Sequence, residues 1–216
     1  MSEAPRTPLY QRALELSDQV LEDQVVPLYY RIDKANSEER GKPLPYLKIA
    51  TTLVREYGLK TIVEIGSMRG PMDHGFDEIS KCCVEGHSTL FFADTGAEVY
   101  TVDVNHYCAQ VLVAYTRKYR NLHVYTADGI WFLKKFDRAI DLLYLDAWDV
   151  IPGSNFAEKH LEAYRAAQPH LASSSVILID DTDLLNGGKG RQAIPQMIRD
   201  GFDLVTWGRQ ALLVRA

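Results

Sequence analysis

From residue 60 onward, short apolar runs rich in β-branched and aromatic residues alternate with longer segments of helical periodicity. A strand followed by a helix, repeated five times, is typical of a mostly parallel sheet covered by helices on both faces. The five runs are TIVEIG (61–66), EVYTVDV (98–104), LHVYTAD (122–128), DLLYLD (141–146) and SSVILIDD (174–181). Two further runs, FDLVTWG (202–208) and ALLVRA (211–216), are joined by a turn too short for a crossover helix, so we expect antiparallel neighbours. The pattern predicts an α/β fold with a doubly wound, mostly parallel, seven-stranded sheet that ends in an antiparallel strand pair.

Two helical segments precede the first of these strands. Apolar residues recur every three or four positions across residues 8–34, and a second such pattern spans residues 46–57 and stops at a glycine. A polar, proline-bounded linker, residues 37–45, separates them. We expect residues 1–43 to form a helical extension that serves as a lid or a homodimer contact, and residues 44–216 to form the sheet domain.

Composition limits the partners and the compartment. The 216-residue chain is 46% hydrophobic, which suits one domain with a substantial core, and its net charge of -5 argues against a surface that binds nucleic acid or membranes. No apolar run approaches the roughly 20 residues of a membrane-spanning helix, and the first residues lack the apolar core of a signal peptide. Cys82, Cys83 and Cys108 are odd in number, which argues against a disulfide framework. We expect a cytoplasmic protein.

Each of the five strands that precede a helix ends in an acidic residue. Ligands of open α/β sheets bind outside the carboxyl ends of the strands, so these residues are the ones to examine. An acid before a helix also commonly caps the helix, which is the alternative at every position. Five in succession favour a ligand site at this edge of the sheet. The acids are Glu64, Asp103, Asp128, Asp146 and the pair Asp180 and Asp181.

The turn after the first strand resembles a nucleotide-binding loop with an insertion. Asp103 lies about forty residues beyond Glu64, at a strand end where a carboxylate can accept hydrogen bonds from both ribose hydroxyls. The usual spacing between a glycine turn and such an acid is roughly 20 residues. Removing residues 67–85 restores that spacing, so we expect one loop that Gly86 and Ser88 resume at the next helix. Long insertions of this kind are more often functional lids or substrate-binding loops than neutral additions.

Five motifs in this order resemble the class I S-adenosylmethionine-dependent methyltransferases: E-I-G-S, V-D, A-D-G, L-D, and the antiparallel strand pair. Within that superfamily, DLLYLDAWD and VILIDDTDLLNGG resemble the metal-dependent small-molecule O-methyltransferases of the catechol and caffeoyl-CoA type, and the macrocin and cephalosporin-hydroxylase-like groups. The resemblance implies a Rossmann-like fold and an enzyme that binds S-adenosylmethionine. It implies cofactor contacts by Glu64, Gly66, Ser67, Gly86, Ser88, Asp103, Asn105, Asp128, Gly129 and Asp146.

The same resemblance implies a magnesium site at Asp146, Asp180 and Asp181. The chemistry agrees, because carboxylates gathered at neighbouring strand ends repel one another unless a cation lies among them, and oxygen ligands select Mg²⁺ or Ca²⁺. A cation bound to a substrate hydroxyl would acidify it for attack on the methyl group. The alternative is that Asp181 and Asp183 cap the following turn while only Asp146 faces the pocket.

One departure from the catechol-type pattern concerns the general base. Those enzymes carry a lysine three residues after the fourth-strand Asp, and this chain has Asp149 there. The predicted catalytic residues are therefore Asp146 and Asp149, because a weak base suffices for an acidified hydroxyl. His106 and His160 are alternatives by residue type.

The segment GGKGR contains two basic residues, Lys189 and Arg191. Either they bind an anionic group of the substrate, or they are solvated at the entrance of a helix.

The sequence thus predicts transfer of a methyl group from S-adenosylmethionine to an oxygen of a small-molecule acceptor, assisted by Mg²⁺, as in natural-product modification. Sugar hydroxyls, polyketides, phenols and amines all remain open as acceptors. One alternative is a nicotinamide-dependent oxidoreductase, although no uninterrupted G-x-G-x-x-G follows a strand. Another is an inactive protein that binds S-adenosylmethionine without turnover.

Overall fold

The computed structural model describes residues 7–20, 25–27, 39–41, 43–69, 87–184 and 186–215. Its centre is a seven-stranded sheet with the order β5-β4-β3-β6-β7-β9-β8. The strands are β3 (Thr61–Ile65), β4 (Glu98–Asp103), β5 (Leu122–Thr126), β6 (Ile140–Leu145), β7 (Leu171–Ile179), β8 (Phe202–Trp207) and β9 (Ala211–Arg215). β3 to β7 run parallel, and β9 lies antiparallel between β7 and β8. The predicted α/β class, the seven-stranded sheet and the antiparallel C-terminal pair are confirmed.

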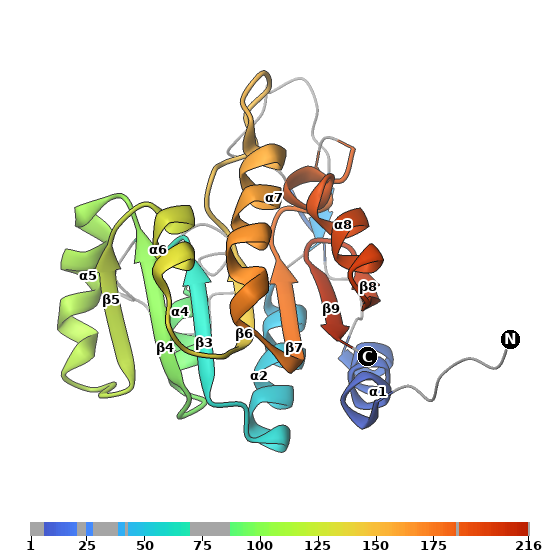
Figure 1. The fold of residues 1–216 in the computed structure, drawn as a ribbon, viewed down its shortest axis with the longest axis horizontal. Helices are drawn as coiled ribbons and strands as arrows, with labels where there is room; N and C mark the ends of the chain where they lie inside the picture. Colours follow the sequence, from blue (N-terminus) through green and yellow to red (C-terminus); the bar gives the residue numbers. More distant parts are fainter. Residues whose placement is uncertain are drawn as a thin grey trace, which may run out of the picture.

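Helices cover both faces of the sheet (Figure 1). One face carries the four helices α1, α2, α4 and α5, and the other face carries α6, α7 and α8, which lie in front of the strands in this view. Of the short 3-10 helices in the described chain, η1 directly precedes β7 and η2 lies between β7 and α8. The bounds are α1 (Pro8–Val20), α2 (Leu44–Tyr57), α4 (Ser88–Ala93), α5 (His106–Thr116), α6 (Gly129–Lys135), α7 (Phe156–Ala167), α8 (Ala193–Arg199), η1 (Gln168–His170) and η2 (Gly188–Gly190).

The near-continuous apolar runs of the central strands supply both cores. Successive side chains of a strand point to opposite faces, so a strand covered on both sides is apolar at every position. In β3, Ile62 packs into the core beneath α1, α2, α4 and α5, whereas Val63 packs into the core beneath α6, α7 and α8. Leu142 and Leu143 of β6 divide in the same way. Among the described residues, apolar side chains cover both faces of the central strands, which leaves the strand ends as the place for a ligand.

The N-terminal region corrects the prediction of one helix across residues 8–34. Helix α1 covers Pro8–Val20, and a strand β1 (Val25–Pro27) pairs antiparallel with β2 (Glu39–Gly41), inside the stretch predicted as a linker. Pro27 explains the error, because proline lacks the amide hydrogen that a helix interior needs and its ring clashes with the preceding turn. The second predicted helix is confirmed as α2, which ends at Gly58 with a left-handed backbone.

Part of the predicted insertion lies outside the described residues. The structure does not describe residues 70–86, which include Cys82, Cys83 and Gly86. The predicted lid and the predicted role of Gly86 therefore stay predictions. Within the part of the chain that the structure describes, no helix is long and apolar enough to cross a membrane.

Candidate ligand-binding site at the carboxyl edge of the sheet

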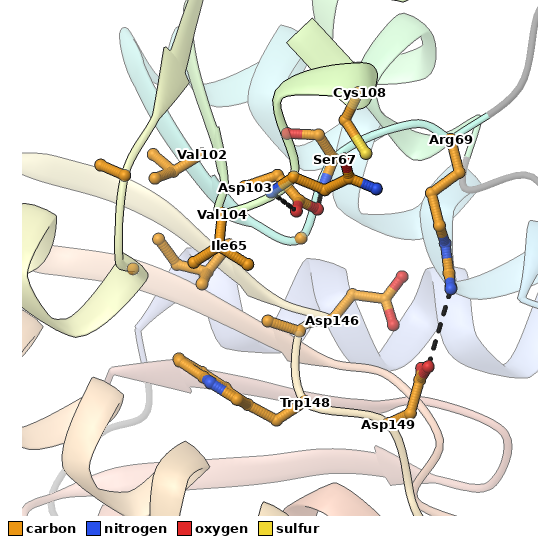
Figure 2. Close-up of a pocket in the computed structure, with 15 residues that line it drawn as sticks. Ile65, Ser67, Arg69, Val102, Asp103, Val104, Cys108, Asp146, Trp148 and Asp149 are labelled. Atoms are coloured by element: carbon orange, nitrogen blue, oxygen red, sulfur yellow. Dashed lines mark hydrogen bonds and ion pairs between the residues drawn. The ribbon is translucent and has the colours of Figure 1, made fainter.

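A cavity of about 340 Å³ lies at the carboxyl ends of β3, β4, β5 and β6 (Figure 2). Its walls are partly apolar, from Ile65, Val102, Val104 and Trp148. Its polar lining residues are Ser67, Arg69, Asp103, Asn105, Asp146 and Asp149. The cavity therefore lies at the edge predicted from the strand-terminal acids, and two of those acids, Asp103 and Asp146, line it.

Gly66 turns the chain at the floor of the cavity. Its φ is +98°, and a Cβ on this residue would lie 2.8 Å from the backbone of Asp146 and Ala147. Gly129 also lines the cavity, and a Cβ there would lie 2.4 Å from the Ile65 side chain. Both glycines thus let neighbouring chain segments approach closely, and a side chain at either position would disturb the floor.

Asp103 presents its carboxylate at the end of β4, where backbone amides hold it. Oδ2 accepts a hydrogen bond from the Ser67 amide at 3.0 Å, and Oδ1 accepts one from the Asn105 amide at 2.8 Å. Each carboxylate oxygen has two lone pairs, so the carboxylate retains capacity for a ligand hydroxyl. Asn105 caps α5 by accepting from the Tyr107 amide at 3.0 Å. This hydrogen bond fixes the Asn105 side chain at the start of α5, where Asn105 also lines the cavity.

Glu64 joins the two ends of the predicted insertion. Its carboxylate accepts hydrogen bonds of 2.6 Å from the hydroxyls of Ser88, Thr89 and Thr101, and the Met68 amide donates to Thr89 Oγ1 at 3.2 Å. The expectation that the first turn and the helix at Ser88 form one unit agrees with these contacts. Neither Glu64 nor Ser88 is among the described lining residues of the cavity.

Burial controls the protonation of Glu64. The side chain is fully buried, and desolvation raises its pKa to about 7 although the three hydroxyls oppose the shift. Its burial and its hydrogen bonds to three hydroxyl groups therefore give Glu64 a structural role next to the Gly66 turn.

Asp128 acts as a helix cap in the structure. The side chain is exposed, and Oδ1 accepts a hydrogen bond from the Trp131 amide at 2.7 Å at the start of α6. Its neighbours Ala127 and Gly129 line the cavity, but Asp128 is not among the described lining residues. The cofactor contact predicted for Asp128 stays a prediction.

The three acids predicted to bind a metal do come together. One oxygen atom from each of Asp146, Asp180 and Asp181 lies within 4.8 Å of the others. Of the three, only Asp146 lines the cavity, while Asp180 and Asp181 are buried behind it. This arrangement matches one part of the alternative considered from the sequence, namely that Asp146 alone faces the pocket.

Two buried cations share this cluster of acids. Lys189 Nζ lies 2.5 Å from Asp146 Oδ1 and 3.0 Å from Asp181 Oδ2. Arg209 lies 3.0 Å from Asp180 Oδ2 and also contacts Asp181. Lys189 is completely buried, so the expectation that it is solvated at a helix entrance is wrong. The reason is that the turn before it folds inward over the end of β7.

Arg209 was missed from the sequence, although strand register offers a signal. Ile179 of β7 pairs with Ala211 of β9 in the antiparallel register. Two steps beyond that pair, Asp181 faces Arg209, and one step beyond it Gln210 Nε2 donates to Asp180 Oδ1 at 2.8 Å. An acidic pair after one strand and Arg-Gln before its antiparallel partner could have indicated the contact.

Burial and the neighbouring charges shift the pKa values of both Asp180 and Lys189 upward. Burial raises the pKa of Asp180 well above its ordinary value, and the carboxylates of Asp146 and Asp181 raise it further. Burial alone would lower the pKa of Lys189, but the three carboxylates outweigh it and the net shift is upward. Lys189 therefore stays protonated and cannot serve as a base.

Asp149 and Arg69 lie opposite each other across the cavity, with 3.7 Å between Oδ2 and a guanidinium nitrogen (Figure 2). Their side chains are 42% and 40% exposed, so both are accessible from solvent. The two histidines considered as alternative bases are placed less favourably. His160 is fully buried, its Nδ1 lies 2.6 Å from the Phe156 carbonyl oxygen, and burial lowers its pKa to about 3. His106 is exposed and is not among the described lining residues. Of the three, Asp149 alone is placed to act on a molecule in the cavity.

Comparisons with known proteins extend this picture. No protein-family model matches the chain, and no curated protein matches it. Solved structures do match. A putative O-methyltransferase from Klebsiella pneumoniae is 16% identical with a TM-score of 0.54, over 99% of this chain and 93% of that one. The O-methyltransferase TomG from Streptomyces achromogenes, involved in tomaymycin synthesis and in complex with SAM, is 13% identical with a TM-score of 0.53, over 99% and 92%.

An O-methyltransferase from Bacillus cereus in complex with SAH is 14% identical with a TM-score of 0.51, over 98% of this chain and 91% of that one. The likeness extends over nearly the whole length of each chain, which includes the strand pair at the C-terminus. This chain therefore has the same Rossmann-like fold as these three O-methyltransferases.

Proposed function

We propose that this protein transfers a methyl group from S-adenosylmethionine to an oxygen of a small-molecule acceptor. The observation that carries the proposal is the position of Asp103. Its carboxylate ends β4 and lines a cavity beside the Gly66 turn, in a fold that matches SAM-bound and SAH-bound methyltransferases. That place suits the two hydroxyls of a ribose.

The cavity is suited to S-adenosylmethionine in size and chemistry. Its volume of about 340 Å³ lies within the usual range for small-ligand pockets. Asp103 offers hydrogen-bond acceptors, and Val102, Val104 and Trp148 offer apolar surface for a base. When bound, the cofactor supplies an electrophilic methyl group on a sulfonium.

Asp149 is the proposed proton acceptor. An acceptor hydroxyl near its carboxylate would lose its proton to Asp149 as the new bond from oxygen to the methyl carbon forms and the bond from sulfur to that carbon breaks. Arg69, 3.7 Å away, forms an ion pair with this carboxylate at the cavity. Asp146, at the same wall, would help to orient the acceptor.

The predicted Mg²⁺ does not fit these contacts. A metal needs free carboxylate oxygens, and each of Asp146, Asp180 and Asp181 already pairs with a buried protein cation. We therefore base no step on a metal. The net charge of -5 supports a protein that acts on a small molecule and binds neither nucleic acid nor membranes. The odd number of cysteines supports a cytoplasmic location, because it argues against a disulfide framework.

The test is calorimetric titration with S-adenosylhomocysteine and, separately, with NADH. We expect S-adenosylhomocysteine to bind and Asp103→Ala to weaken it by about 10- to 100-fold, because hydrogen bonds to a charged group are lost. Asp137→Ala, which removes an acid whose side chain is 89% exposed, is the matched control and should leave binding unchanged. Binding of NADH but not of S-adenosylhomocysteine would overturn the proposal in favour of an oxidoreductase.

A further inference from the structure

Three consecutive residues with left-handed backbone bring Lys189 to the acids. Asn186, Gly187 and Gly188 have φ values of 59°, 98° and 48°. A Cβ on Gly188 would lie 1.7 Å from the Asp181 carbonyl oxygen, so only glycine can occupy that position. The same carbonyl accepts a hydrogen bond from the Lys189 amide at 3.2 Å. This hydrogen bond holds the turn against the end of β7, and the Lys189 side chain points toward the acids.

Three oxygen atoms lie close to the Lys189 ammonium nitrogen. Nζ lies 2.5 Å from Asp146 Oδ1, 2.9 Å from the Asp146 carbonyl oxygen and 3.0 Å from Asp181 Oδ2. The two Asp146 oxygens accept hydrogen bonds from the ammonium group, and the Asp181 carboxylate is its ion-pair partner. The side chain has no exposure to solvent. These oxygen partners offset the free-energy cost of burying the charged lysine, which would be far higher without them.

A divalent cation would compete with this ammonium group for the same space. Mg²⁺ binds carboxylate oxygens at about 2.0–2.1 Å, so a metal shared by Asp146 and Asp181 would lie where Nζ lies. To enter, the metal would have to expel a fully buried lysine that has three oxygen atoms close to its Nζ. Arg209 meanwhile neutralises Asp180 and Asp181 from the other side.

We propose that Lys189 is the resident cation of the three-carboxylate cluster and takes the place of a divalent metal. The cluster then binds no Mg²⁺ or Mn²⁺ while the lysine is present, and removal of the lysine opens it to a metal. Lys189 is a positioning residue, which holds the Asp146 carboxylate at the cavity wall. The metal-binding part stands without the proposed function, and only its consequence, methyl transfer that needs no metal, rests on that function.

The experiment measures Mn²⁺ binding by electron paramagnetic resonance of the free ion. In the wild type we expect no Asp146-dependent Mn²⁺ site of millimolar or tighter affinity. Lys189→Ala should gain one Mn²⁺ site, and the double variant Lys189→Ala/Asp146→Asn should lose it again. Lys159→Ala is the matched control, because that lysine pairs with Glu162 at 3.0 Å on the exposed face of α7. It should behave as the wild type does.

Two results would overturn the proposal. One is a wild-type Mn²⁺ site that Asp146→Asn abolishes, and this result can be obtained even if Lys189→Ala does not fold. The other is a folded Lys189→Ala, judged by circular dichroism, that gains no Mn²⁺ site. Failure of S-adenosylhomocysteine to bind would overturn the proposed function and leave the Mn²⁺ results to decide the role of the lysine.

Discussion

Glu64 shows how burial can turn an expected ligand contact into an internal support. The sequence places it in a cofactor turn, where a charged carboxylate would face a ligand. In the structure the carboxylate instead faces the hydroxyls of Ser88, Thr89 and Thr101, out of contact with solvent. Because burial disfavours the charged form more than these hydroxyls favour it, the pKa of Glu64 rises to about 7.

This shift predicts a stability that depends on pH. The folded chain holds the Glu64 proton more tightly than the unfolded chain does, so the stabilisation is fully present below the ordinary pKa of 4.5 and is lost as pH rises through about 7. Between pH 4.5 and pH 8 the loss from this group is on the order of 3 kcal/mol. Urea unfolding of wild type and Glu64→Gln at pH 5 and pH 8 should show a smaller loss in the variant.

The control for that experiment is Asp137→Asn, which removes an exposed carboxyl group and should follow the wild-type profile. Parallel profiles of wild type and Glu64→Gln would show that Glu64 does not titrate in this range, and would contradict the prediction.

Helix α1 illustrates the scale of a single element. The apolar stripe that suggested a lid or a dimer contact packs instead against α2, β8 and β9 of the same chain. Leu9, Tyr10, Ala13 and Leu16 on this stripe are buried in the core. The helix therefore contributes to the stability of the sheet domain, while a dimer contact or a lid formed by the rest of the extension stays a prediction.

If α1 is an integral part of the core, a cavity beneath it should destabilise the whole protein. Leu9 is 3% exposed, and Leu9→Ala should lower the free energy of unfolding by about 2–4 kcal/mol. Gln11→Ala, on the exposed side of the same helix, should change it very little. Chemical unfolding in urea measures both. Equal stability of the two variants would mean that α1 detaches before the domain unfolds.

At the scale of the whole molecule, strand order decides which side chains meet at the site. Two cores fill the space on either side of the sheet, so the carboxyl ends of the strands are left for a ligand. The insertion of β9 between β7 and β8 brings Arg209 and Gln210 beside Asp180 and Asp181. The cavity and the acid cluster are thus built from the ends of the five parallel strands, β3 to β7, and from one antiparallel strand, β9.

Ligand binding at this edge should stabilise the folded state as a unit. S-adenosylhomocysteine at 100 times its Kd should raise the free energy of unfolding by about 2.7 kcal/mol, because it binds the folded chain alone. Thermal unfolding with and without the ligand should show a higher Tm with it. In Asp103→Ala the same concentration should give a clearly smaller rise. An equal rise in both proteins would place the ligand away from Asp103.

Much of the fold follows from periodicity, because the alternation of strand and helix patterns is local in the sequence. The antiparallel strand pair followed from a turn too short for a helix, and the position of the cavity followed from acids at strand ends. The prediction of one long helix across residues 8–34 is wrong, because Pro27 does not suit a helix interior although the apolar residues around it keep a helical spacing.

The sequence alone was enough to predict the α/β sheet, its antiparallel end and an acid-rich ligand edge, since these depend on short-range patterns. Only the tertiary structure decided what neutralises the acids. Lys189 reaches them through a turn of left-handed residues, and Arg209 reaches them across an antiparallel register. Both contacts join residues that are distant in the chain or separated by an unusual backbone path, and burial then determines which of the groups remain charged.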